Sequence, residues 1–547
     1  MNILNNPKEI INTRLFKILF LVVNISILLL IFSQRKFIIF RDYSVIWDGA
    51  YRISNGLTPY TDFGIPVGPI SFYLPALFFK LFGASWFNLQ LSQFVINFSL
   101  IFTAWKILNL ISSNKYYLYF GMTLFMMNYI ILLSHPWYNT SAALLLLLSI
   151  LLILYSNIYF NFLSGFICAV CIFTKQDYAL MSIFSSSILI LFLNKNKDLF
   201  IPKNIYEIID KLFSIRFLLF LIGLLSGVIL FFNIFDSSQM GYWFNYGQFP
   251  HYPRTPSLTR TILNTQFYLS IICLWVSFLK KDLSLFVSFL ILLSSGVCSQ
   301  TSGLIFTSGF FIFLTPLIFF QIYKLNYNLL KSLPVLLLLF ISIFNNLNRS
   351  LNIFKGVIKN KFEPSSMSYS DLKISPSDLS KCASEFRNIY GPSSICRQID
   401  LIRKELKGRD SDRKIVFLNM SELTPLQSIL DVEIASKLPL WFDEDVTLFK
   451  REKEIIKENI QEGKYDLIAL QATHDPWNEF YNQTLEEILN NKNYRELGDM
   501  QYVSPKGSLS YFYVKDRCNT SLSENYYFSE DCEKSLKPIR FFIRKNL

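Results

Sequence analysis

The sequence predicts a mainly α-helical protein, with a polytopic bundle of roughly 11–13 membrane-spanning helices followed by a small extracytoplasmic α/β domain. A series of long apolar runs decides this prediction, and two features of the composition support it. The 547 residues are 52% hydrophobic and 17% charged, which is unusually apolar for a soluble protein. Residues 348–547 hold 30 basic and 30 acidic side chains, whereas residues 1–347 hold 22 and 10. The net charge of +12 therefore lies among the apolar runs. This pattern excludes a disordered chain and argues against nucleic acid as a partner, because the basic residues form no single patch.

The expected spans share a length and apolar character near those of a transmembrane helix. They are Leu15–Ser33, Leu89–Ile111, Tyr117–Ser134, Ala142–Tyr155, Phe160–Thr174, Ala179–Leu193, Phe217–Phe235, Ile262–Leu279, Leu283–Val297, Leu304–Tyr323 and Leu333–Phe344. Ile70–Phe82 is a shorter candidate that contains Pro75 and Lys80.

Basic residues orient these spans in the membrane. Lys and Arg precede the first run, and five more lie in Asn194–Arg216, so the N-terminus and this loop are expected in the cytoplasm. Gln34–Pro69, Asp236–Arg260 and the chain after Asn345 are then expected outside the inner membrane. Twelve spans would place both termini on one side, so one apolar segment must be broken, re-entrant or not a span.

The polar C-terminal region reads as a separate domain. We expect a membrane module over residues 1–347 with its first outside loop at 34–69, a linker over 348–380, and an α/β domain over 381–547. Buried strands are expected at Lys414–Asn419 and Tyr465–Gln471, helices at Lys450–Glu462 and Thr484–Asn490, and a hairpin around residues 505–507. The cysteines of this domain are Cys382, Cys396, Cys518 and Cys532. Two disulfides with three possible pairings are expected outside the cell, and a zinc site is the alternative, although no CxxC spacing occurs.

Three carboxylates lie close together in the first outside loop, at Asp42, Asp48 and Asp62. A carboxylate is costly to bury at a membrane surface, so their proximity among Trp and Tyr residues indicates a site. The alternative is structural: Asp42 pairs with Arg41 or caps an interfacial helix.

The motifs of this loop resemble those of a known superfamily. The loop contains Asp48-x-x-Tyr51, Asn55-Gly56-x-x-Pro59-Tyr60-x-Asp62-Phe63 and Gly68-Pro69, and the apolar segment after it ends in Lys80-Leu81-Phe82-Gly83. It resembles the polytopic GT-C glycosyltransferases, in particular the protein mannosyltransferase and aminoarabinose transferase branch. Phe173-Thr174-Lys175-Gln176-Asp177-Tyr178 looks like a variant of that group's Lys-Gly-Pro motif. Gly49 replaces the second acid of the usual Asp-Glu pair, and Val67-Gly68-Pro69 replaces Lys-Pro-Pro, so lipid A is not implied as the acceptor.

The resemblance implies an inverting transfer of a sugar from a polyprenyl-phosphate donor to an envelope glycan, lipid or protein. It implies an acidic catalytic base in the first loop. Such chemistry needs a carboxylate whose pKa lies near the working pH, and it needs cations around the leaving phosphate. Asp48 is the expected base, with Asp42 as the alternative. The expected substrate contacts are Arg52, Tyr60, Asp62, Lys175, Asp177, Trp243, His251 and Arg254. A divalent metal ion held by Asp42 or Asp48 stays open.

Some of these residues also have a structural explanation, and other classes of protein are alternatives to a glycosyltransferase. Lys175 can instead be a span-end residue that pairs with Asp177, and the aromatic loop 236–260 can be an interfacial belt rather than a lid. A transporter or flippase of lipid-linked sugars is the main alternative function. Such proteins carry charges near the middle of the membrane and are often built from two repeated halves. In this sequence the acidic residues lie at the ends of spans, and no internal repeat occurs. An envelope polysaccharide polymerase or ligase and a membrane-anchored binding protein are further alternatives. Deletion of residues 380–547 would separate the last of these from an enzyme.

Overall fold

The computed structural model describes residues 41–130, 137–235, 265–326, 376–407, 414–471, 479–500 and 539–545, with short gaps inside these ranges. The described residues form two compact units. The helical unit comprises residues 93–234 and 265–326, and the α3–sheet unit comprises residues 41–92, Phe235 and residues 376–545. The chain is mainly helical with a small sheet, as the sequence predicts.

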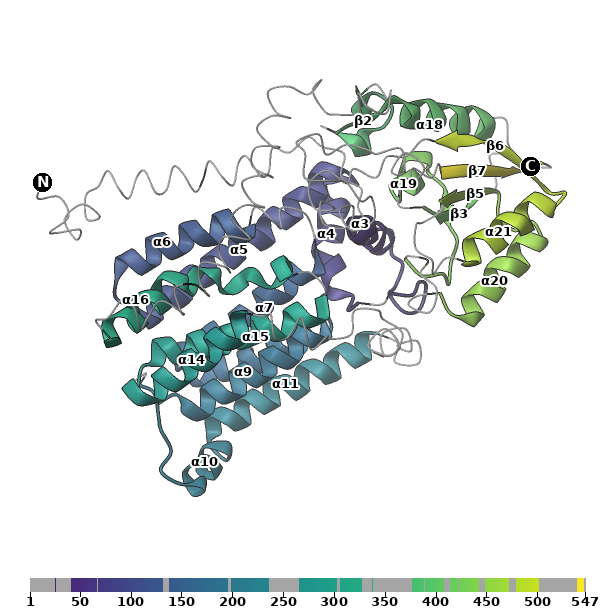
Figure 1. Ribbon diagram of the computed structural model, residues 1–547. Helices are drawn as coiled ribbons and strands as arrows, with labels where there is room; N and C mark the ends of the chain where they lie inside the picture. The colour runs from purple at the N-terminus through teal and green to yellow at the C-terminus, as the bar shows by residue number, and fades with distance from the viewer. Residues whose placement is uncertain are drawn as a thin grey trace, which may run out of the picture. The chain divides into compact units, whose positions relative to one another are not determined.

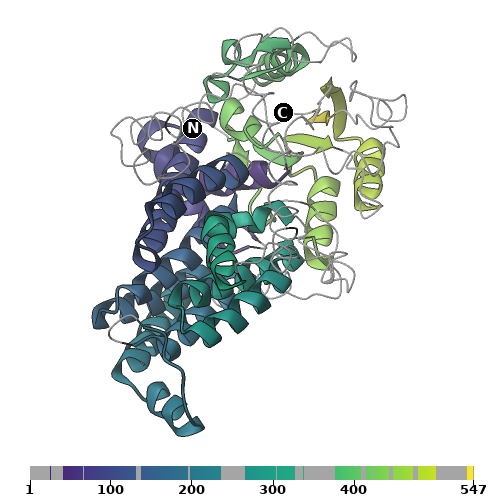
Figure 2. The same cartoon turned by 60° about the vertical axis from the view of Figure 1, so that its left-hand side comes forward.

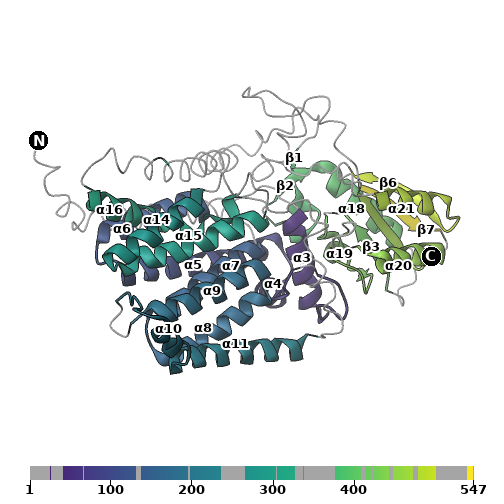
Figure 3. The ribbon, with the colours of Figure 1, turned by 60° about the horizontal axis from the view of Figure 1, so that its bottom comes forward.

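The helical unit is a bundle of apolar helices that run side by side (Figures 1 and 3). Its elements are the greater part of α5 (Trp86–Ile111), α6 (Lys115–Phe125), the π-helix η2 (Met126–Ile130), α7 (Tyr138–Leu154), α8 (Ile158–Ile172), α9 (Gln176–Phe192), α10 (Ile205–Leu212), α11 (Ile215–Ile234), α14 (Thr265–Lys280), α15 (Leu283–Ser302), η5 (Ile305–Leu314) and α16 (Thr315–Asn326).

Small and polar residues bring these helices together. A Cβ atom on Gly165 of α8 would collide with the backbone carbonyl of Phe220 in α11. One on Gly223 of α11 would collide with the carbonyl of Phe162. Such close approach of two backbones at glycine is typical of helices packed in a membrane. Serine pairs add links between helices, including one of 2.8 Å between the hydroxyls of Ser149 and Ser182.

Among the described helices, α5 and α11 are long and apolar enough to cross a membrane by length and composition. Shorter apolar helices in this part of the chain, such as α7, α8, α9 and α14, have 10–17 residues. Most of the runs singled out in the sequence coincide with helices, and the described part of the run Tyr117–Ser134, up to Ile130, consists of α6 followed by η2. The runs at residues 15–33 and 333–344 lie outside the described residues, so the number of spans and their orientation stay predictions.

The α3–sheet unit contains a mixed five-stranded sheet and a separate pair of short strands. The elements of the unit are α3 (Arg41–Ser54), α4 (Ile70–Phe82), β1 (Pro376–Asp378), the 3-10 turns η8 (Leu379–Lys381) and η9 (Ser384–Phe386), β2 (Tyr390–Pro392), α18 (Ser393–Leu406), β3 (Val416–Met420), α19 (Leu426–Leu430), β4 (Glu433–Ile434), α20 (Lys450–Gln461), β5 (Leu467–Gln471), α21 (Glu479–Asn490), β6 (Tyr494–Met500) and β7 (Ile539–Arg544). β1 pairs with β2, and the strand order of the five-stranded sheet is β4-β3-β5-β7-β6. β3 is parallel to β4 and β5, and β7 is antiparallel to β5 and β6.

Both faces of the sheet are buried, which explains the continuous apolar runs of its central strands. Leu418 and Ile468 share one core with Ile456 of α20 and Phe480 of α21. The alternate positions, such as Leu467, are also buried. The predicted strands and helices of this region are confirmed to within a few residues at most of their ends. The start of the second predicted helix is wrong by more, because α21 begins at residue 479. The predicted hairpin around residues 505–507 lies outside the described residues.

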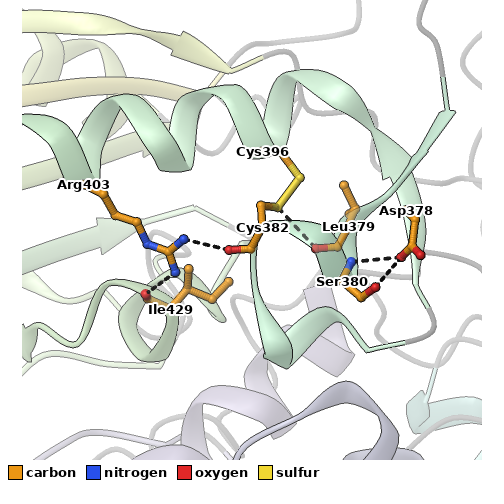
Figure 4. Close-up of a disulfide and its surroundings, with 7 residues drawn as sticks. All are labelled: Asp378, Leu379, Ser380, Cys382, Cys396, Arg403 and Ile429. Carbon is orange, nitrogen blue, oxygen red and sulfur yellow. Dashed lines mark hydrogen bonds between the residues drawn. A yellow bond between two sulfur atoms is a disulfide. The ribbon is translucent and has the colours of Figure 1, made fainter.

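A disulfide joins Cys382 to Cys396, with 5.3 Å between their Cα atoms. It ties the end of η8 to the first turn of α18 (Figure 4). Arg403, two turns further along α18, donates to the carbonyl of Cys382 at 2.7 Å and to that of Ile429 at 3.1 Å. The disulfide and this guanidinium together fix the chain that precedes the sheet. The other two cysteines of the region, Cys518 and Cys532, lie outside the described residues.

Candidate functional site

α3 brings Asp48 and Arg52 together as a buried ion pair. The two residues are one helical turn apart, so their side chains lie on the same face. The Arg52 Nε donates to Oδ1 of Asp48 at 3.0 Å, and Nη2 donates to Oδ2 at 2.9 Å. The two residues are 2% and 3% exposed. Burial raises the pKa of the Asp48 carboxyl above its ordinary value of 3.8, while the charge and hydrogen bonds of Arg52 act in the opposite direction.

Aromatic rings line the helix that carries this pair. Trp47 stacks on Trp86, with ring centroids 5.9 Å apart, and tilts against Phe79 at 4.8 Å. The guanidinium of Arg52 lies 5.4 Å from the ring centroid of Phe63. The pair is therefore enclosed by low-dielectric side chains, which strengthens its mutual attraction and makes the loss of either partner costly.

Gly49 explains one departure of this loop from the GT-C pattern. A Cβ atom at this position would lie 2.5 Å from Cδ1 of Phe72 in α4. Phe72 is completely buried, so α3 and α4 pack together only because residue 49 has no side chain. A second carboxylate after Asp48 has no room in this packing.

The C-terminal region holds α3 and the loop that follows it. Thr424 donates its hydroxyl to the carbonyl of Ser44 in α3 at 2.9 Å. The backbone of Gly64 accepts from Leu440 at 3.0 Å, and the carbonyl of Asp62 accepts from Lys437 at 2.7 Å. The first loop and the chain around residues 424–440 are therefore parts of one compact unit. The sequence carries no signal for these contacts, because the partners are more than 360 residues apart.

The other residues predicted in the first loop have structural partners. Tyr60 is buried with a backbone φ of 68°, and burial raises the pKa of its phenol. Its ring meets Phe235 edge-on at 6.1 Å. Asp62 accepts from the backbone N–H of Thr58 at 2.6 Å, so it closes the turn of the loop. Asp42 lies in the first turn of α3, and its side chain is outside the described set.

Lys175 and Asp177 lie in the helical unit and form an ion pair of 3.0 Å where α9 begins. The Lys175 ammonium also lies 4.8 Å from the ring centroid of Tyr178 and 5.9 Å from that of Tyr138. These contacts match the structural alternative that the sequence left open for Lys175. The Lys175 side chain is 14% exposed, so its ammonium is largely enclosed by Asp177 and the aromatic rings.

The remaining predicted contacts, Trp243, His251 and Arg254, lie outside the described residues. Within the part of the chain that the structure describes, no three His, Cys, Asp or Glu side chains gather as a metal site would require. The described residues bring together Asp48 with Arg52 and, separately, Lys175 with Asp177. Each pair provides one carboxylate and one cation, which is what proton transfer and phosphate binding need.

No protein-family model matches the chain, and no curated protein matches it either. Two similar solved structures are those of ArnT from Cupriavidus metallidurans. The structure bound to undecaprenyl phosphate has 8% sequence identity, covers 89% of this chain and 96% of that chain, and has a TM-score of 0.47. The apo structure has 9% identity, covers 83% of this chain and 92% of that chain, and has a TM-score of 0.48. Identities this low assign no residue role in this chain.

Proposed function

We propose that the chain is an inverting glycosyltransferase that moves a sugar from a polyprenyl-phosphate donor to an envelope glycan, lipid or protein. Its site would open at the outer face of the inner membrane, with the N-terminus in the cytoplasm and the C-terminal region outside. The observation that carries this proposal is the buried Asp48–Arg52 pair, since it lies within the loop whose motifs resemble the acidic first loop of GT-C enzymes.

In this proposal Asp48 is the general base. Its carboxylate takes the proton of the acceptor hydroxyl, whose oxygen attacks the anomeric carbon from the face opposite the phosphate. The bond from that carbon to the phosphate oxygen breaks, and the polyprenyl phosphate leaves with the electron pair. Burial keeps the pKa of Asp48 above that of an exposed aspartate, which makes it a stronger base once it is ionised.

Arg52 positions this base. Its two hydrogen bonds fix the plane of the carboxylate, and its charge favours the ionised form. Asp48 is 2% exposed, so in this proposal the side chains around it must move before an acceptor hydroxyl can reach its carboxylate.

The remaining predicted residues have supporting roles in the proposal. Lys175, with Asp177 holding its ammonium in place, neutralises the leaving phosphate. Trp243, His251 and Arg254 contact the lipid-linked sugar, and Tyr60 and Asp62 shape the loop around the base. A divalent ion held by Asp42 or Asp48 would add to the neutralisation of the phosphate.

The test is transfer of labelled sugar by membranes that contain the full chain and synthetic polyprenyl-phosphate sugars. Asp48→Asn keeps the shape of the side chain but removes the base, and we expect transfer to fall to background with unchanged expression. Asp378→Asn is the matched control and should keep most activity, because its amide oxygen still accepts from the backbone N–H of Ser380. Unchanged transfer by Asp48→Asn would overturn the role of this residue.

Exchanging the two partners distinguishes a catalytic pair from a structural one. The double variant Asp48→Arg with Arg52→Asp keeps both charges one turn apart. If the pair has only a structural role, the double variant should keep its transfer activity. If Asp48 is the base, moving the carboxylate by one helical turn should abolish transfer. If the label crosses the bilayer while it is still attached to its lipid, the chain is a flippase and the proposed transfer is wrong.

A further inference from the structure

α10 is an amphipathic helix that turns its apolar face outward. Its apolar side chains recur at the spacing of one helix face. The exposed ones are Ile205, Tyr206, Ile209, Leu212 and, just after the helix, Phe213, whereas Ile208 is partly buried. Phe213 is 84% exposed and Tyr206 is 73% exposed, and no residue of α10 is buried. A helix on the surface of a soluble protein has the opposite arrangement, with its apolar stripe against the core.

The polar side of α10 makes the contacts to the rest of the helical unit. Lys211 donates to the side-chain oxygen of Asn194 at 3.4 Å, and its ammonium lies 4.7 Å from the ring centroid of Phe200. Asn204 caps the helix by accepting from the backbone N–H of Glu207 at 3.0 Å, so the helix has a defined start. α10 is therefore held by its polar side, and its apolar side faces away from the described part of the bundle.

The outward face continues along α11, which follows α10 after two residues. α11 is long and apolar enough to cross a membrane. Its exposed side chains include Ile215, Leu218 and Leu225. The apolar surface of α10 therefore runs into the surface that the lipid chains would contact on a spanning helix.

The end of the bundle where α10 projects (Figures 1 and 2) carries basic residues as well as acidic ones. Phe192 at the end of α9 contacts the rings of Phe278 and Phe286 at 5.9 Å and 5.4 Å. These rings flank the α14–α15 turn, so Lys280 and Lys281 lie at the same end as α10. Membrane proteins carry an excess of basic residues on the cytoplasmic side, where the lipid headgroups are anionic.

We propose that α10 is an interfacial anchor that lies in the plane of the cytoplasmic leaflet. Its partner is a bilayer that contains anionic phospholipid. The side chains of Tyr206 and Phe213 enter the boundary between headgroups and acyl chains, to a depth of about 5–10 Å for helices of this kind. Lys203 and Lys211 remain at the level of the lipid phosphates. The anchor fixes the height of the α9–α11 connection in the membrane, and it does not depend on which reaction the protein catalyses.

The test measures the depth of α10 in vesicles of phosphatidylcholine and phosphatidylglycerol that contain the full chain. Nitroxide labels are placed through Phe213→Cys and Ile205→Cys on the apolar face and through Asp210→Cys at an exposed polar position of the same helix. The free cysteines among the described residues are buried, and the unsubstituted protein measures any background label. The collision rates of each label with oxygen and with a water-soluble nickel chelate are compared.

We expect the labels at 213 and 205 to collide with oxygen and to be shielded from nickel, and the label at 210 to show the reverse. Equal access of nickel to all three positions would overturn the proposal. Strong spin–spin broadening at position 213 would also overturn it, since the face would then be covered by a second copy of the chain. The measurement needs no transferase activity, so its failure leaves the proposed function untouched.

Discussion

Removing Arg52 should destabilise the α3–sheet unit strongly. The guanidinium makes two hydrogen bonds of 3.0 Å and 2.9 Å to a carboxylate that is 2% exposed. Arg52→Met keeps the apolar stem but leaves the charge of Asp48 buried without its cation. Loss of one partner of a buried pair costs about 3–5 kcal/mol. For a unit of this size that corresponds to an unfolding temperature lower by roughly 6–20 °C.

The pH dependence of this variant identifies the cause. Without Arg52, burial acts unopposed on Asp48 and raises the pKa of its carboxyl further above the ordinary 3.8. A group whose pKa is raised on folding stabilises the fold below its unfolded pKa, and this stability is lost as the pH rises through the folded pKa. The loss of stability caused by Arg52→Met should therefore be largest near neutral pH and should shrink as the pH falls toward 4.

The assay is thermal unfolding of the purified full chain, followed by tryptophan fluorescence, because Trp47 and Trp86 stack within the same unit. The double variant Asp48→Leu with Arg52→Met replaces the pair by apolar side chains. It should recover most of the loss, since such replacements are neutral or stabilising by about 1–4 kcal/mol. A single variant as stable as the unsubstituted protein, or a double variant no better than the single one, would refute this account.

Three other changes test the packing. Gly49→Ala places a Cβ against a buried phenyl ring and should cost about 1–3 kcal/mol in thermal unfolding; an unchanged unfolding temperature would show that α3 and α4 pack less closely. Reduction of the Cys382–Cys396 disulfide, which closes a short loop, should cost roughly 3 kcal/mol, and a dithiol titration that leaves stability unchanged would contradict this. Gly165→Ala should lower the yield of folded protein in detergent because its Cβ meets a backbone carbonyl, whereas Gly296→Ala, with ring atoms at 3.4 Å, is the matched control and should not.

The elements of the sheet could be predicted because local sequence decides them. Leu467–Gln471 is apolar along most of its length, and both faces of β5 are buried. Lys450–Gln461 alternates charge and apolar residues at helical spacing, and Ile456 and Ile460 are buried. The pairing of Asp48 with Arg52 follows from the same rule of helical spacing, once the first loop is known to contain a helix.

The surroundings of the site could not be predicted in the same way. The requirement for glycine at position 49 depends on where the ring of Phe72 falls, and this is set by the crossing of two helices. The bond from Thr424 to Ser44 joins residues 380 positions apart. No periodicity or spacing encodes such a contact, because it depends on how the sheet packs against α3.

These contacts change how the C-terminal region can be tested. Deletion of residues 380–547 is expected from sequence to separate an enzyme from a membrane-anchored binding protein. The structure places Thr424, Lys437 and Leu440 against the helix and loop that contain Asp48. The deletion would remove this support. We therefore expect it to abolish the activity of an enzyme as well as the function of a binding protein, so it does not distinguish the two.

A point substitution keeps the two possibilities apart. Thr424→Val retains the shape of the side chain but removes its hydroxyl bond to α3, which is worth about 0.5–1.5 kcal/mol. If the C-terminal region positions the base, transfer should fall in this variant while the unfolding temperature changes by only a few degrees. Ser421→Ala, which removes a local bond to Asn419, is the control in the same loop. Equal transfer by the two variants would mean that this region acts independently of α3.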